Sequence, residues 1–167
     1  MISERAVPLR IDFEKEPGLV YDEIPRFTPE CFAWIQSTST AQFKRFREGL
    51  DQLLQEGVVQ SFLLKNSSQR VPLLAAVGPL QFEVVQYRLH SEYGAETRLE
   101  RAPWTIMRWV TSPSVAEMLD ESTLPTGSKL AIDVRGNTVI LFSEQWSCDF
   151  FSQRNPEVPL SDLAPKA

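Results

Sequence analysis

The fold is decided by residues 73–99, which read LLAAVGPLQFEVVQYRLHSEYGAETRL. Residues 73–77 form a short run that is apolar on both faces, which is typical of a strand at the centre of a sheet. Gly78 and Pro79 end this run, and Pro79 suits the first turn of a helix because its missing N–H would have no partner there. Apolar residues then recur at steps of three and four up to Gly94, a residue type that favours helix ends. The stretch predicts a strand, a helix and a second strand joined by tight turns.

The preceding residues add a helix and two strands to this stretch. Ser39 with Gln42 predicts a capping box before a helix that ends at Gly57. Strands are expected over residues 30–36, 58–64 and 71–77. The element order is then βαββαβ, which is typical of a ferredoxin-like unit over residues 24–102. Two apolar helix faces are expected to point inward: Phe43, Phe46, Leu50, Leu53 and Leu54 on the first helix, and Leu80, Phe82, Val84, Val85, Leu89 and Tyr93 on the second.

Residues 103–156 predict a second, smaller unit with the order βαββα. Ser112 and Pro113 suit the start of a short helix, and Gly136-Asn137 suits the turn of a hairpin. A last helix is expected from Ser143, with Trp146, Phe150 and Phe151 inward. The fold class is therefore α+β, a ferredoxin-like βαββαβ unit packed against a βαββα unit. Residues 1–23 are expected to be an extended segment or a remnant of a preceding domain, and residues 157–167 an extended, mobile tail.

The open face of the first sheet needs a cover, because a ferredoxin-like sheet carries helices on one face only. We expect the second unit, with Trp104 and Trp109, to supply that cover. The two cysteines, Cys31 and Cys148, lie among apolar neighbours and are expected to be small hydrophobic residues in the interior.

Composition places the chain among ordinary globular proteins. It has 167 residues, of which 43% are hydrophobic and 23% charged. It contains no apolar run long enough to cross a bilayer and no secretion signal, so we expect a cytoplasmic protein without membrane contact. A net charge of −5 disfavours binding to nucleic-acid phosphates as the main activity of the chain by itself, and we expect no DNA partner.

Three segments resemble the C-terminal third domain of bacterial release factor 3: IPRFTPECFAWI (24–35), KRFREGLDQLLQEGVVQ (44–60) and AAVGPLQFEVVQYRLHSEYGAETRLE (75–100). The similarity runs from about Ile24 to Leu163 in the order of the family. The helix start G-x-L-x-x-x-V and the helix end RL-x-x-EYG are more distantly similar to the third domain of elongation factor G.

The resemblance implies a ribosome-docking domain of a translational GTPase that promotes recycling of class I release factors. Its implied partners are a small-subunit protein, ribosomal RNA, the class I factors, and the G domain and barrel domain of the same factor. GTP and Mg²⁺ would bind in that G domain, outside this chain. The chain contains no G-x-x-x-x-G-K-[ST] motif, and its lone His90 has no nucleophile at useful spacing. We therefore expect no catalytic, cofactor or metal site here.

Six residues are the candidates for ribosome contact. Lys44, Arg45 and Arg47 begin the first predicted helix, where they form either a solvated face or an edge that contacts RNA phosphates. Lys65, Asn66 and Arg70 lie in the polar loop between two predicted strands, and such loops often carry binding. Two other interpretations stay open: a stand-alone regulatory or ligand-binding module, and a small enzyme. We also expect ion pairs between Arg88 and Glu92, and between Arg98 or Arg101 and Glu96 or Glu100.

Overall fold

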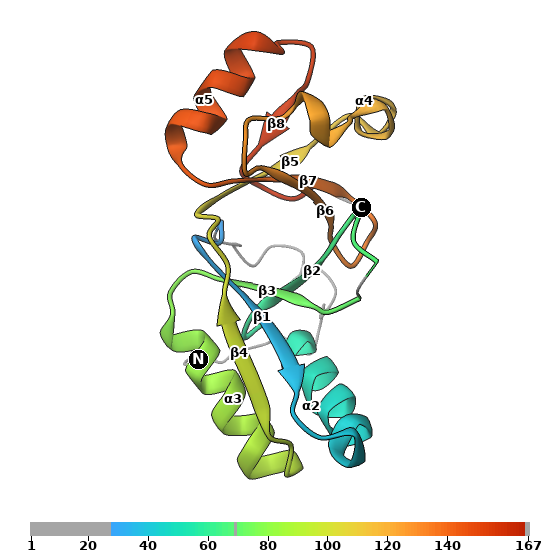
Figure 1. Cartoon of the computed structure of the whole chain (residues 1–167), viewed down its shortest axis with the longest axis vertical. Coiled ribbons are helices and arrows are strands. Elements are labelled where there is room, and N and C mark those ends of the chain that lie inside the picture. Colours follow the sequence, from blue (N-terminus) through green and yellow to red (C-terminus); the bar gives the residue numbers. More distant parts are fainter. Residues whose placement is uncertain (1–27, 69, 166–167) are drawn as a thin grey trace, which may run out of the picture.

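The computed structural model describes residues 28–68 and 70–165 (Figure 1). The predicted α+β class is confirmed. The expectations for residues 1–23 fall outside the described residues. The first unit contains β1 (Cys31–Ser37), α2 (Phe43–Gln55), β2 (Gln60–Leu64), β3 (Leu73–Ala76), α3 (Leu80–Tyr93) and β4 (Thr97–Arg101). The second contains β5 (Ile106–Val110), α4 (Pro113–Met118), β6 (Lys129–Ile132), β7 (Thr138–Phe142), α5 (Gln145–Arg154) and β8 (Leu160–Ser161).

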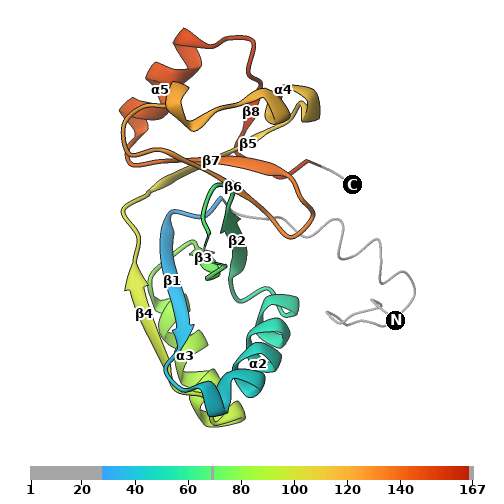
Figure 2. The same cartoon turned by 45° about the vertical axis from the view of Figure 1, so that its right-hand side comes forward.

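The eight strands found among the described residues belong to one sheet, in the order β4-β1-β3-β2-β6-β7-β5-β8, and every neighbouring pair is antiparallel. The two units meet where β2 pairs with β6, Leu63 opposite Ile132 and Leu64 opposite Ala131. Figures 1 and 2 show α2 and α3 at one end of the molecule and α4 and α5 at the other, with the two halves of the sheet between them. The units therefore share a sheet, which the sequence did not indicate.

The two halves of the sheet also face each other across a buried core. Strand residues alternate between faces, so that Leu73 and Ala75 of β3 point to this central core while Leu74 and Ala76 point to α2 and α3. The second unit contributes Met107, Trp109, Ala131, Val139 and Leu141, together with Trp104. The expected cover of the open sheet face is thus present. A third core lies between β5, β7 and the last two helices, and it holds Cys148.

Two of the predicted helix ends are confirmed and one is wrong. Gly94 follows α3 with a φ of 64°, the left-handed conformation that glycine adopts without strain. Ser112 accepts a hydrogen bond from the backbone N–H of Val115 at the start of α4. The capping box of Ser39 and Gln42 is absent, because the Gln42 side chain instead accepts from the backbone N–H of Glu96 at 2.9 Å. A short 3₁₀ turn (Thr40–Gln42) leads into α2 there.

Several large side chains that were expected inward lie on the surface: Phe43, Leu80, Val84, Trp146 and Phe150. The cause is a rotation of about 100° per helical residue, which puts neighbouring residues on different sides of a helix. In α5 the buried line is Ser147, Cys148 and Phe151, so Trp146 and Phe150 point to solvent. That helix also begins at Gln145 rather than Ser143.

The described part of the C-terminal tail is packed onto the second unit. β8 pairs with β5, Trp109 opposite Ser161 and Val110 opposite Leu160. Val158, just before β8, is buried in the third core. The sequence predicted an extended, mobile tail rather than this pairing, because a strand of two residues has no periodicity to detect.

Candidate functional site

The first candidate surface is the α2 basic group, Lys44, Arg45 and Arg47. Phe46 is buried against the core, and since α2 packs by that side, the flanking basic residues face solvent. The Arg47 guanidinium lies 5.9 Å from the centre of the exposed Phe43 ring. Such a contact holds an arginine in place while leaving its N–H groups open to an anion.

The second candidate surface is the β2–β3 loop group, Lys65, Asn66 and Arg70. All three residues are exposed. The Lys65 ammonium, however, donates to the backbone oxygen of Ala116 and to the hydroxyl of Thr138, both at 3.4 Å. Lys65 therefore bridges the two units, and this contact competes with any partner for its charge.

The structure does not bring the two groups together. The start of α2 lies beside the end of α3 and the beginning of β4, where Gln42 contacts Glu96. The β2–β3 loop lies beside β6, because the backbone N–H of Lys65 donates to Leu130 at 2.9 Å. Figure 2 shows these places at opposite ends of the first unit. A partner would have to contact them as two separate surfaces.

The polar residues beside the α2 basic group are arranged differently from the expected ion pairs. His90 contacts Glu96 near the end of α3. Arg98 donates to the Gln36 side chain on the neighbouring strand at 3.4 Å, rather than to Glu96 or Glu100. Both side chains of the His90–Glu96 pair are more than half exposed, so solvent screens this pair strongly.

Arg88 joins α3 to the end of α2. Its guanidinium contacts Glu92 one turn away at 2.8 Å, which confirms the predicted pair. It also contacts Glu56 at 2.7 Å, a partner that the sequence did not indicate because Glu56 lies 32 residues away. These hydrogen bonds lower the pKa of both carboxyl groups below their ordinary value of 4.5 and raise the pKa of Arg88. These two contacts, which we call the Arg88 clamp, link the two helices that cover the first half of the sheet.

We expect Arg88→Gln to destabilise the chain slightly at neutral pH and not in acid. A carboxyl whose pKa is lowered by folding stabilises the fold above its unfolded pKa, and this contribution is lost as the pH falls through the folded value. The difference in melting temperature from the parent chain should therefore be largest near pH 7 and vanish well below pH 4.5. Thermal unfolding followed by circular dichroism from pH 7 to pH 3 measures it. If the difference in melting temperature grows as the pH falls, the contacts of Arg88 with Glu56 and Glu92 do not stabilise the fold in this way.

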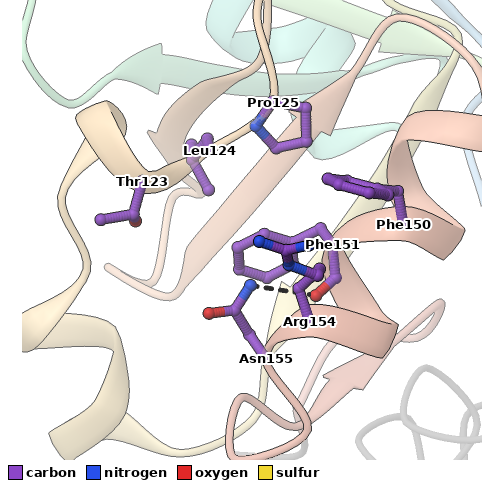
Figure 3. Close-up of a pocket in the computed structure, with 7 residues that line it drawn as sticks. All are labelled: Thr123, Leu124, Pro125, Phe150, Phe151, Arg154 and Asn155. Carbon is purple, nitrogen blue, oxygen red and sulfur yellow. Dashed lines mark hydrogen bonds between the residues drawn. The ribbon is translucent and has the colours of Figure 1, made fainter.

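A third surface lies on the second unit, and the sequence did not predict it as a site. Trp146, Phe150 and Arg154 follow one another along α5 at four-residue spacing and form what we call the α5 ladder. The two rings are stacked, with centres 5.2 Å apart and planes 14° apart, and the Arg154 guanidinium lies 5.3 Å from the Phe150 ring. Beside the ladder is an open hollow (Figure 3) lined by Thr123, Leu124, Pro125, Phe150, Phe151, Arg154 and Asn155.

Three further observations concern residues 28–68 and 70–165. Within those ranges no three side chains of the metal-binding types, histidine, cysteine, aspartate and glutamate, are grouped so that they could hold a metal ion. No helix in the same ranges has the length and apolar character needed to cross a bilayer. Burial raises the pKa of the Cys148 thiol, and the nearby Arg108 charge opposes this shift only in part.

An α+β domain with exposed basic groups on one half and an exposed aromatic ladder on the other has the features of a domain that contacts other macromolecules. Comparison with known families identifies the family to which this domain belongs. Residues 21–152 match the family described as class II release factor RF3, C-terminal domain. The chain belongs to this family, as its resemblance to release factor 3 predicted.

Individual relatives support the assignment. The chain is 43% identical over 150 residues to peptide chain release factor 3 of Synechococcus elongatus, and 41% identical over 145 residues to that of Trichodesmium erythraeum. These alignments cover 89% and 87% of this chain and 26% of each relative. A relative from Cyanothece is 40% identical over 152 residues, or 88% of this chain and 27% of the relative. The chain thus spans about a quarter of the length of these relatives.

Proposed function

We propose that this chain is the ribosome-docking C-terminal domain of a release factor 3-type GTPase that promotes recycling of class I release factors in translation termination. The family match over residues 21–152 is the observation that carries the proposal. In this proposal GTP and Mg²⁺ bind to the G domain of the whole factor in the cytoplasm. This chain has no phosphate-binding motif with which to hold them and performs no chemistry itself.

The architecture supports a mechanical role for the domain. A single sheet runs through both units, and a shared core holds its halves together, so the domain can transmit force as one body. A rigid domain that contacts two ribosome conformations unequally shifts the equilibrium between them by the difference in its contact free energy. In this mechanism the G domain supplies the nucleotide switch, and this chain supplies the differential contacts.

Fusion to the rest of a factor tests the proposal. The chain is joined to the G domain and barrel domain of the peptide chain release factor 3 of Synechococcus elongatus, in place of that factor's own C-terminal domain. We expect the chimera to restore ribosome-stimulated GTP hydrolysis and release of a class I factor from post-termination ribosomes. A correctly folded chimera that hydrolyses GTP without ribosome stimulation would refute the proposal.

We further propose that the α2 basic group contacts phosphates of ribosomal RNA. Changing Lys44, Arg45 and Arg47 together to alanine is then expected to weaken binding of the chimera to ribosomes roughly tenfold or more at low salt. The slope of log affinity against log salt should also become shallower, by about 0.7 to 0.9 for each phosphate that the variant no longer neutralises. Sedimentation of ribosomes with labelled factor at several salt concentrations measures both quantities.

Arg135→Ala is the matched control, since this arginine is also exposed but lies in the β6–β7 turn of the other unit. It should leave the affinity and the salt slope unchanged. If the triple variant binds like the parent factor, the α2 basic group is a solvated helix face. The same assay on Arg70→Ala tests the β2–β3 loop separately.

A further inference from the structure

The α5 ladder lies on the molecular surface and contributes no side chain to the shared core. The exposed fraction of Trp146 is 64% and that of Phe150 is 41%, while Phe151 on the other side of α5 is buried. Two large rings held in a parallel stack at the surface keep apolar area in contact with water, which a monomeric domain usually avoids. The stack is rigid because α5 fixes both rings at four-residue spacing. Its composition, tryptophan, phenylalanine and arginine, is that of residues enriched at protein interfaces.

One contact within the α5 ladder shows which chemical group its rings can bind. The Arg154 guanidinium lies 5.3 Å from the centre of the Phe150 ring, so an arginine of this chain uses one rung of the stack. Trp146 is the better cation acceptor of the two rings, and most of its surface is open. Arg154 is eight residues from Trp146, about 12 Å along the helix, which is beyond the range of strong repulsion at physiological salt.

Charge decides which partner fits this surface. Residues 103–165 carry eight acidic and four basic side chains, a net charge of −4. Asp149 is exposed and lies one turn from Trp146, where its carboxylate accepts a hydrogen bond from Gln145 at 2.9 Å. An RNA strand could stack a base on Trp146, but its phosphates would enter this negative field. A cationic segment would be attracted by it.

We propose that the α5 ladder is a docking site for a basic protein segment that places an arginine side chain over Trp146. The guanidinium stacks on the indole and its charge is balanced by Asp149, while an adjacent apolar side chain of the segment enters the hollow beside Phe150 (Figure 3). This site lies on the second unit, whereas the α2 basic group lies on the first, so it is independent of the RNA contact proposed above.

The test uses the full 167-residue chain and two synthetic peptides labelled with fluorescein. One has about twelve residues in which arginines alternate with leucine and serine, and the other replaces each arginine with citrulline, which keeps the shape and removes the charge. Fluorescence anisotropy should show roughly tenfold tighter binding of the arginine peptide, weakening as salt is added. Trp146→Ala should weaken the binding of that peptide about fivefold to tenfold, and Asp149→Asn about twofold to threefold.

Two further variants separate docking from general attraction to an acidic protein. Trp146→Phe keeps an aromatic face and should retain most of the affinity. Tyr87→Ala removes an aromatic ring that is 71% exposed on α3, away from the ladder, and should change nothing. The proposal is overturned if Trp146→Ala binds the arginine peptide as tightly as the parent chain, or if the citrulline peptide binds equally well. It is also overturned if a single-stranded RNA of about the same length binds at Trp146 more tightly than the peptide.

Discussion

Replacing Phe62 with alanine is expected to lower the free energy of unfolding by about 3–5 kcal/mol, the usual cost of truncating a fully buried phenylalanine. Phe62 lies in β2, the strand through which the first unit pairs with the second. Its side chain is 1% exposed and its ring centre is 6.3 Å from that of Trp109 in β5. The substitution would therefore leave a cavity in the core that the two halves of the sheet share.

Urea unfolding followed by tryptophan fluorescence and circular dichroism measures this destabilisation. Both signals should move together, because one shared core makes the two units unfold as one. Phe62→Leu keeps much of the volume and should cost under about 1.5 kcal/mol. Tyr87→Ala, at an exposed site, should stay within about 0.5 kcal/mol. If Phe62→Ala costs less than about 1 kcal/mol, or if the second unit unfolds separately with unchanged stability, the central core does not couple the units.

Local sequence patterns were sufficient for the longer helices and strands and their order, although not for the two-residue strand β8. The apolar spacing of residues 80–93 and the glycine that follows them specify α3, because the helical period and a left-handed C-terminal residue are both local properties. The double-sided apolar run at Leu73–Ala76 was likewise a correct sign of a strand buried on both faces. Neither pattern indicated that β2 would pair with β6, since that pairing joins residues far apart in the chain, Leu63 and Ile132.

The surface residues were harder to place, for a physical reason. An apolar residue on a helix can face the core or a partner, and hydrophobicity alone does not distinguish the two. Trp146 and Phe150 were therefore expected inside, although α5 packs by the Cys148 and Phe151 side. Lys65 was one of the candidates for ribosome contact, and only the fold shows that it reaches Ala116 and Thr138 in the other unit.

The sequence also did not predict that the α2 basic group and the β2–β3 loop group would lie far apart. Figures 1 and 2 show the start of α2 and the β2–β3 loop at opposite ends of the first unit, an arrangement that the order of the elements along the chain does not specify. Arg88 shows the same limit on a smaller scale. Its partner one helical turn away could be predicted from spacing, whereas its contact with Glu56 depends on how α2 and α3 cross.

The crossing of α2 and α3 also predicts a second large loss of stability, on substitution of Gly49 in the middle of α2. A Cβ atom at this position would lie 2.7 Å from side-chain atoms of Leu89 and Tyr93 in α3, closer than carbon atoms in proteins approach. Leu89 is fully buried, and the contacted part of Tyr93 is the ring near its attachment point, so neither can move aside cheaply. The glycine is therefore required by helix packing, even though glycine is a poor helix former.

We expect Gly49→Val to lower the free energy of unfolding by about 2–3 kcal/mol, since the helices must separate to admit the side chain. For a chain of this length the melting temperature should fall by about 2–4 °C for each kcal/mol. Gly78→Val is the control. A Cβ atom at Gly78 meets no atom within 4 Å, so this substitution should leave the free energy of unfolding nearly unchanged. In a Tyr93→Ala background Gly49→Val should cost clearly less, because part of the clash is gone. An equal cost in both backgrounds would show that the close crossing of α2 and α3 is not the cause.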